Sequence, residues 1–274
     1  MFSVPQMQKG NIPVDGGNLI IENADIEDFL LHEPQAGKYI RKLLGADEYI
    51  NNKERYCLWL VGADPSDFRK MPLVMERIEK CKQFRLSSPK AATRRFADYP
   101  FLFMEIRQPN TTYILVPRHS SGERRYIPFG FISSEVITTD ANSTIADATL
   151  YHFGILTSNV HMAWVRAVCG RIKSDYRYSN DIVYNNFPWP DATDEQKSEI
   201  EQLANAVLDA RELFPDSSLA DLYDPLTMPP ELLKTHQALD RAVMKLYGFS
   251  AKDTTEATCV AALMERYQAL TNTE

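Results

Sequence analysis

The stretch Arg171-Ile172-Lys173-Ser174-Asp175-Tyr176-Arg177-Tyr178-Ser179 decides how this chain is interpreted, because its charged residues fall on alternate positions. In a β-strand, alternate residues face the same side of the sheet. A single strand over 171–177 would therefore place four charged side chains of mixed sign on one face. Burying such a face without partners would cost a large amount of free energy. We therefore expect a strand whose charged face lies at the surface.

Two interpretations of this face are open. In the first, Lys173 and Asp175 form an ordinary surface ion pair, which contributes little to stability. In the second, the face meets base edges in a groove of double-stranded DNA. Lys and Arg donate to O6 and N7 of guanine, and Asp accepts from N4 of cytosine, so the two side chains together would contact both bases of one G·C pair. Taken alone, these residues favour the ion pair.

The rest of the sequence predicts an α+β protein. The segment Ile182–Pro190 extends the strand block to 171–190. Apolar and β-branched runs predict further strands at 55–61, 112–117, 125–131 and 135–139. Helical spacing predicts helices at 25–33, 35–44, 72–86 and 150–168, and Gly170 is suited to cap the last of them.

The composition changes after Pro190. Thr193 and Gln196 form a capping box for a helix that runs to about Phe214. Further helices are predicted at 218–223, 231–247 and 254–270, and no strand pattern follows. We therefore expect a mixed α/β domain over 1–190, in which residues 1–22 are a connector, and an all-α domain over 191–274.

The bulk properties indicate a cytoplasmic protein. The 274 residues are enough for one large domain or two modest ones, and 44% of them are hydrophobic. There is no N-terminal signal and no apolar run long enough to cross a membrane. The four cysteines are far apart and lack metal-ligand spacing, which is typical of reduced thiols in the cytosol.

The charge is distributed unevenly. The whole chain has a net charge of −7, which by itself argues against nucleic-acid binding. However, residues 69–126 carry 13 Lys and Arg against 5 Asp and Glu, whereas residues 191–274 carry 7 against 16. A basic middle segment produces a local attractive field, because salt screens charges beyond roughly 10 Å. The alternative is that some of these residues, such as Arg77 and Lys80, only solvate a helix face.

Basic and hydroxyl side chains near this segment are candidates for DNA phosphate contacts, which position a protein without reading sequence. Some lie on a short helix expected after Pro89, and others lie in the loop around Ser120 and Ser121. The expected phosphate-binding residues are Lys82, Lys90, Arg94, Arg95, Ser120, Ser121, Arg124, Arg125 and Arg171.

Two short motifs imitate catalytic sites. Asn186-Phe187-Pro188-Trp189 has the composition of the adenine-binding motif of methyltransferases, but it lacks the paired prolines and is expected to be a turn. Asp191 with Glu195 and Lys197 imitates a nuclease site, but these acids fall in the first turn of a helix, where they favour the helix dipole. We therefore expect no catalytic residue, no metal site and no cofactor in this chain.

Several unusual strings together resemble the target-recognition region of the MmeI-like type IIL restriction–modification enzymes. The strings that carry the resemblance are Lys53–Leu60, Met71–Val74, Tyr126–Phe131, Ala163–Ser179, Ile182–Pro190 and Leu219–Pro229. The family consists of single-chain adenine methyltransferases that use S-adenosylmethionine. The resemblance implies a carboxy-terminal piece of such an enzyme, inactive alone, whose partners are double-stranded DNA and a methyltransferase part that binds the cofactor.

The resemblance also implies which side chains read bases. Three coupled pairs are expected: Lys173 with Asp175, Arg118 with Asp140, and Ala141 with Arg177. In the third pair a small residue beside a long donor suits a purine. Two other possibilities stay open, namely a separate specificity subunit that joins a methyltransferase chain, and a protein-interaction module whose helical tail docks a partner.

Overall fold

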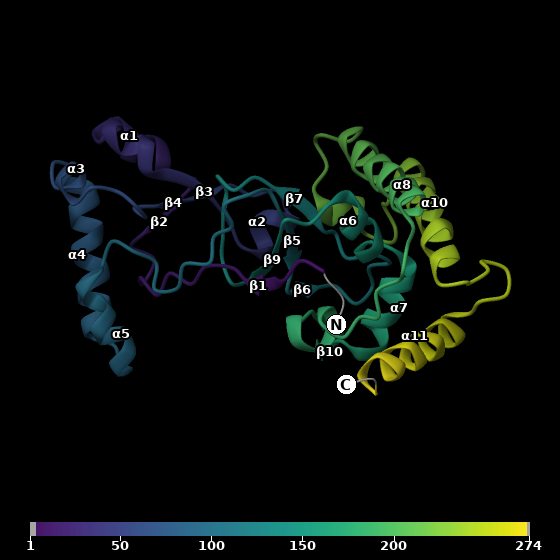
Figure 1. Ribbon diagram of the computed structural model, residues 1–274. Helices are drawn as coiled ribbons and strands as arrows, with labels where there is room; N and C mark the ends of the chain where they lie inside the picture. Colours follow the sequence, from purple (N-terminus) through teal and green to yellow (C-terminus); the bar gives the residue numbers. More distant parts are fainter. Residues whose placement is uncertain (1–3, 273–274) are drawn as a thin grey trace. The chain divides into compact units, whose positions relative to one another are not determined.

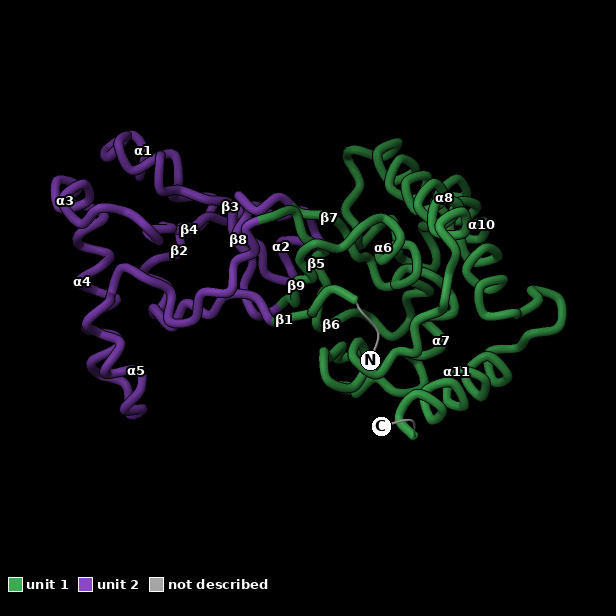
Figure 2. Tube along the Cα trace, in the orientation of Figure 1, with its two compact units in different colours: residues 1–8, 111–132, 142–274 green, residues 9–110, 133–141 purple. Residues whose placement is uncertain are grey.

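The computed structural model describes residues 4–272, and they divide into two compact units (Figure 2). Unit 1 comprises residues 1–8, 111–132 and 142–274, and unit 2 comprises residues 9–110 and 133–141. The chain therefore enters each unit more than once. Together the units form the α+β architecture that the sequence predicts, with mixed sheets first and helices alone after residue 191 among the described residues.

The main sheet of unit 1 has the strand order β1-β9-β5-β7, namely β1 (Met7–Lys9), β9 (Asn142–Ala146), β5 (Tyr113–Pro117) and β7 (Gly130–Ile132). β5 pairs antiparallel with both β9 and β7. All five residues of β5 are buried, which explains its continuous apolar run. This strand lies at the centre of the core of unit 1.

Helices of unit 1 pack into the same core as this sheet (Figure 1). They are α6 (Leu150–Leu156), α7 (Asn159–Val168), α8 (Asp194–Glu212), α9 (Leu219–Leu222), α10 (Pro230–Leu246) and α11 (Glu256–Thr271). The close packing of α6 on α8 depends on Gly154, because a Cβ there would lie 2.6 Å from Ile200. The compact units do not divide at Pro190, so the expected division into domains there stays a prediction.

Unit 2 is built on a second four-stranded sheet, in the order β2 (Ile20–Glu22), β4 (Arg55–Leu58), β3 (Ile40–Leu44) and β8 (Ile137–Thr138). Its longest helix is α4 (Pro72–Leu86), whose two bounds agree with the prediction from the sequence. The shorter helices are α1 (Ile26–His32), η1 (Pro34–Tyr39), α2 (Ala46–Ile50), α3 (Pro65–Phe68), α5 (Ala91–Arg95) and η2 (Phe96–Asp98).

Two predictions were wrong for unit 2 and for the N-terminal segment that leads into it. The helix expected over 35–44 ends at Tyr39, and Ile40–Leu44 forms a strand because it pairs with β4 on one side and β8 on the other. The expected connector over 1–22 contributes β1 and β2, and Leu19 and Ile21 are fully buried. Residues 1–3 of that connector lie outside the described residues.

Three predictions for unit 1 were also wrong. The helix expected over 150–168 is two helices, because Ser158 caps α7 by accepting a hydrogen bond from the His161 backbone. Gly170 begins a strand instead of capping a helix. The strand expected over 182–190 is replaced by a π-helix, η3 (Asn180–Tyr184), and a turn. Pro188 and Pro190 lack the N–H that a strand ladder needs.

Candidate nucleic-acid interface

The stretch 170–177 is a β-hairpin, so the prediction of one continuous strand was wrong. β10 (Gly170–Ile172) and β11 (Asp175–Arg177) pair antiparallel, with Ile172 opposite Asp175. The chain reverses at Lys173, whose φ of 56° is in the left-handed region. Lys173 is not one of the residue types that favour a positive φ, which is why the alternating pattern suggested a single strand.

A third strand completes this small sheet. β6 (His119–Ser120) pairs with β11, so that His119 lies opposite Arg177 and Ser120 lies opposite Tyr176. Directly opposite residues share one face of a sheet. One face therefore carries Ile172, Asp175, Arg177 and His119, all of which are exposed, and we call it the hairpin face. The other face carries Tyr176 and Ser120, which are buried, together with Arg171.

Lys173 and Asp175 do not form the ion pair that the simpler interpretation required. None of the ion pairs within residues 4–272 joins these two side chains. Lys173 is exposed at the tip of the hairpin. Asp175 is also exposed, and its Oδ1 accepts a hydrogen bond of 3.2 Å from the backbone N–H of Gly122. An amine and a carboxylate therefore lie near one tip without neutralising each other.

Arg171 makes a hydrogen bond within the hairpin and lies on the opposite face of the sheet from Asp175 and Arg177. Its Nη1 donates a hydrogen bond of 2.8 Å to the carbonyl of Ser174, in the turn. Its guanidinium lies 4.6 Å from the centre of the Tyr176 ring, on the opposite face from Asp175 and Arg177. The expectation that four charges share one face is corrected to two strand residues, Asp175 and Arg177, with Lys173 at the turn.

The loop 121–125 packs against the hairpin. The Nη1 of Arg124 donates a hydrogen bond of 3.4 Å to the hydroxyl of Ser120. Burial lowers the pKa of Arg124, while Asp224 and Asp175 act in the opposite direction. Because Ser120 is buried and occupied by Arg124, the expectation that it contacts phosphate is corrected. Ser121 is half-buried, and Arg125 is exposed above the ring of Tyr126.

In each of the other two expected base-reading pairs, the two residues belong to different units. Arg118 and Arg177 belong to unit 1, whereas Asp140 and Ala141 belong to unit 2. The position of Asp140 in unit 2 depends on Asn11, whose carbonyl accepts a hydrogen bond of 3.0 Å from the Asp140 backbone. The side chain of Asn11 is fully buried and bonds to Gln108, Thr138 and Arg107. No sequence pattern marked Asn11 as important.

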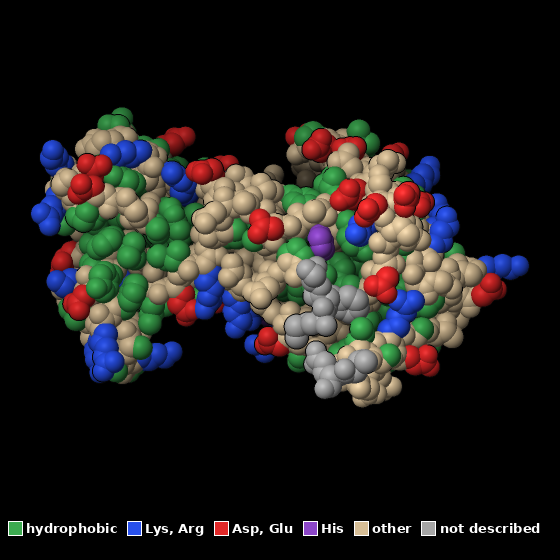
Figure 3. Space-filling model, in the orientation of Figure 1, with side chains coloured by type: hydrophobic (Ala, Val, Ile, Leu, Met, Phe, Trp, Pro, Cys, Tyr) green, Lys and Arg blue, Asp and Glu red, His purple; other side chains and the backbone are tan. Residues whose placement is uncertain are grey.

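Basic side chains gather at α5 of unit 2 (Figure 3). Arg94, Arg95 and Lys90 are exposed there, while Lys82 on α4 is half-buried. Arg94 donates hydrogen bonds of 2.8 Å to the carbonyls of Ser88 and Pro89, which hold its side chain against the preceding loop. The exposed guanidinium and ammonium groups of α5 can meet phosphates without rearrangement of the backbone.

Arg85 is a residue of the basic segment that cannot contact DNA. Its side chain is fully buried on α4, and it donates to five backbone carbonyls, those of Pro13, Val14, Phe96, Tyr99 and Leu102. These carbonyls belong to the segment that follows α5 and to the segment 13–14 near the start of unit 2. Arg85 follows Ile78 and Cys81 at helical spacing, and this apolar stripe was the signal that its side chain points inward.

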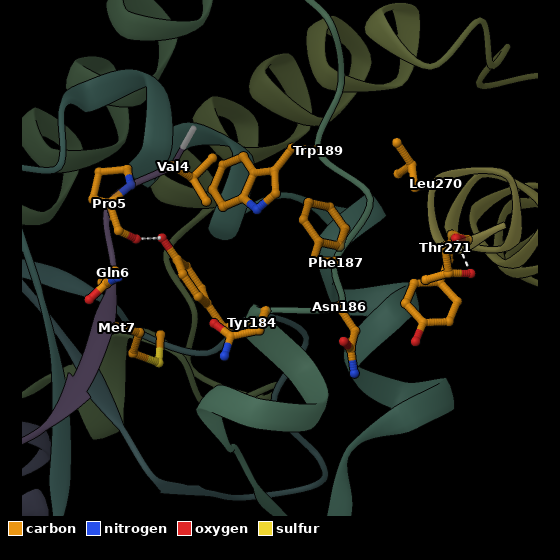
Figure 4. Close-up of a pocket in the computed structure, with 12 residues that line it drawn as sticks. Val4, Pro5, Gln6, Met7, Tyr184, Asn186, Phe187, Trp189, Leu270 and Thr271 are labelled. Carbon is orange, nitrogen blue, oxygen red and sulfur yellow. Dashed lines mark hydrogen bonds between the residues drawn. The ribbon is translucent and has the colours of Figure 1, made fainter. Parts of the chain in front are cut away.

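A cavity of about 530 Å³ opens within unit 1 (Figure 4). It is lined by aromatic and amide side chains, among them Tyr184, Asn186, Phe187 and Trp189, and the hydroxyl of Tyr184 donates a 2.6 Å hydrogen bond to the carbonyl of Pro5. The turn Asn186–Trp189, which resembles the methyltransferase motif in composition, is thus largely buried and packs in the core of unit 1. None of the expected DNA-contacting residues lines this cavity.

The described residues hold neither a metal-binding cluster nor a spanning helix. Within residues 4–272, no group of three or more His, Cys, Asp and Glu side chains is placed to bind a metal ion. In the same part of the chain, no helix combines the length and the apolar character needed to cross a membrane.

Comparison with known families decides what the chain is. Residues 1–191 match the family described as "MmeI, target recognition domain", and residues 192–273 match the one described as "MmeI, C-terminal domain". The chain belongs to the MmeI family. The hairpin face, the loop 121–125 and α5 all lie in the target-recognition match, and α8 to α11 lie in the C-terminal match.

Two proteins similar to this chain are much longer than it is. DNA methyltransferase A of Bacillus subtilis (strain 168) is 38% identical over 268 residues, which are 98% of this chain and 30% of that protein. A solved structure of the type IIL restriction-modification enzyme MmeI in complex with DNA is 46% identical, with a TM-score of 0.95, and the match covers 99% of this chain and 36% of that one. The chain thus spans about a third of the length of these relatives.

Proposed function

We propose that this chain is the DNA-recognition part of an adenine-N6 DNA methyltransferase of the restriction–modification type, whose catalytic part is not in these residues. The observation that carries the proposal is the hairpin face, where Asp175 and Arg177 are exposed beside Lys173 with no ion pair among them within the described chain. Membership of the MmeI family and the DNA bound in the solved MmeI structure support it.

DNA binding would use two kinds of contact, to phosphates and to base edges. Arg94 and Arg95 on α5, with Lys90 at its N-cap, would neutralise phosphates, which supplies affinity without reading sequence. The hairpin face would enter the major groove, whose width of about 12 Å admits a two-stranded ribbon. There Lys173 would donate to O6 and N7 of a guanine, and Asp175 would accept from N4 of the paired cytosine.

The cofactor of the whole enzyme would be S-adenosylmethionine, bound by the methyltransferase part. That part would extrude the target adenine from the helix, as enzymes that modify bases must do. The name of the Bacillus subtilis relative supports methyl transfer by the longer protein. The role of this chain is to hold the duplex in register for that step, and we place it in the cytoplasm with its DNA.

A salt titration of duplex binding by the 274-residue chain tests the proposal. Binding through phosphates releases counterions, so the logarithm of the affinity should fall linearly with the logarithm of salt, by about 0.9 for each phosphate contact. A protein that docks another protein through its helices would show no such dependence on DNA. Absence of salt-dependent binding to any duplex would contradict the proposal.

A further inference from the structure

His119 is an exposed imidazole on the hairpin face. It lies directly opposite Arg177 across the pairing of β6 with β11. The Cβ atoms of directly opposite residues lie about 4.5–5.5 Å apart. The imidazole of His119 and the guanidinium of Arg177 therefore lie on the same part of the hairpin face. Its neighbour in the strand, Ser120, faces the buried side. Any duplex that meets Arg177 and Asp175 therefore also meets His119.

The side chains of the other four histidines each make a hydrogen bond within the fold, and the side chain of His119 makes none within the described residues. His161 and His236 are fully buried and bond to Tyr178 and Tyr223. His152 completes the cap of α6, and His32 bonds to the preceding turn of α1. Within residues 4–272, the ring of His119 makes no hydrogen bond, ion pair or ring contact. Its side chain is therefore not needed to hold this fold together.

The charge state of His119 does not suit a phosphate contact. Although the residue is exposed, partial desolvation of its ring lowers the pKa of His119 below the ordinary 6.5, as do Arg118 and Arg177, and Asp175 opposes them. At neutral pH the ring is therefore mainly uncharged, with one nitrogen that donates and one that accepts. A neutral ring releases no counterion, so it adds little to affinity for phosphates. A single N–H donor does suit the acceptor N7 of a purine in the major groove.

We propose that His119 is a further base-reading residue, which donates to N7 of a purine in the base pair that Arg177 meets or in the next one. The proposal rests on the proposed function, because it requires the hairpin face to enter the groove. N7 is present in both adenine and guanine, whereas pyrimidines have no acceptor there. His119 should therefore distinguish purine from pyrimidine at one position and should not distinguish the two purines.

The test is selection of bound duplexes from a randomised pool by the 274-residue chain, followed by sequencing. The wild type should select a motif with a purine preference at one position. His119→Ala should lose that preference by about tenfold and leave the other positions unchanged, in line with the typical cost of one mismatch. His119→Asn should convert the position to adenine, because an amide contacts N6 and N7 together. His32→Ala, an exposed histidine of unit 2, is the matched control and should select the wild-type motif.

The outcomes separate the two claims. If the wild type selects a motif and both His119 variants select the same motif with the same affinity, His119 reads nothing and the inference is wrong. A uniform loss of affinity for all sequences would also overturn it, because that result identifies a phosphate contact. If the wild type binds DNA but selects no motif, or binds no DNA, the proposed function fails and the inference fails with it. Thermal melting of each variant confirms that the fold is retained.

Discussion

The backbone N–H of Gly122 donates a hydrogen bond to the carboxylate of Asp175, with 3.2 Å between the nitrogen and Oδ1. This contact ties the loop 121–125 to the base of the hairpin turn. A Cβ at Gly122 would lie 2.3 Å from the carbonyl oxygen of Ser174, so the two segments approach as closely as backbones can. The carboxylate of Asp175 is thus held in place before any partner arrives, which lowers the entropic cost of a base contact.

Gly122→Ala should displace the hairpin tip. The added methyl group would overlap the backbone carbonyl of Ser174, so one of the two segments must shift, which typically costs about 1–3 kcal/mol. We expect a lower free energy of unfolding and a larger loss of sequence preference than of total DNA affinity. Gly170→Ala in the same sheet is the control, since a Cβ there meets nothing within 4 Å. Equal behaviour of the two variants in chemical denaturation and in binding would show that the close approach does not matter.

Arg85→Met should unfold or loosen unit 2. The variant leaves five buried carbonyl groups without their donor, and we expect a loss of roughly 3–5 kcal/mol in the free energy of unfolding. Lys80→Met on the same helix removes an exposed ion pair with Glu76 and should cost about 1 kcal/mol or less. Urea denaturation of both variants measures the difference. Similar midpoints would show that the Arg85 contacts are dispensable.

Elements with strong local signals were predictable in this fold, and the long-range pairings were not. Pro72–Leu86 has a proline at its first turn and an apolar stripe, and both of its bounds were predicted correctly. The capping box of Thr193 and Gln196 was confirmed as the start of α8. These signals lie within a few residues of each other, so they need no knowledge of the rest of the chain.

The candidate site was only partly predictable for the same reason. Its charged residues were found from their alternation, but the pairing of β6 with β11 joins positions more than 50 residues apart and leaves no periodic signal. That pairing is what places His119 beside Arg177 and buries Ser120. The turn at Lys173 was missed because its positive φ is held by the contacts of Arg171 and Gly122, not by a turn residue.

Arg94→Ala with Arg95→Ala should weaken binding to all duplexes alike. Each lost phosphate contact should reduce the slope of log affinity against log salt by about 0.9, so the double variant should lose roughly 2. The motif selected from a randomised pool should not change. Lys53→Ala is the control, because its ammonium is paired with Asp47 at 2.7 Å on the surface of the same unit. An unchanged slope in the double variant would remove α5 from the interface.

Asp240→Asn should change how stability depends on pH. Burial raises the pKa of Asp240 from 3.8 to about 6, although Tyr126 and the Asn159 backbone donate to its carboxylate. The folded state therefore holds this proton more tightly than the unfolded state. The stability that the proton provides is full below pH about 4 and is lost as the pH rises through about 6.

The asparagine variant keeps a neutral side chain at every pH. Relative to the wild type, its free energy of unfolding should therefore increase by about 3 kcal/mol between pH 4 and pH 7, from two pKa units at about 1.4 kcal/mol each. Asp209→Asn, at an exposed position of α8, is the control. Denaturation at several pH values measures the difference between variant and wild type. A constant difference would mean that Asp240 titrates normally.

Lys173 and Asp175 are proposed to read one base pair, and exchanging their charges shows whether they do. Asp175→Asn first controls for the contact with Gly122, since its amide oxygen can still accept that bond. Lys173→Glu or Asp175→Arg alone places two like charges at one base pair and should lower affinity for the motif by about tenfold or more.

The decisive measurement is the motif that the double variant, Lys173→Glu with Asp175→Arg, selects from a randomised duplex pool. Glutamate accepts from N4 of cytosine and arginine donates to O6 and N7 of guanine, so one position of the wild-type motif should change from G·C to C·G. The other positions should be retained. If the double variant binds as tightly as the wild type and selects the unchanged motif, the two residues do not read DNA and the account is contradicted.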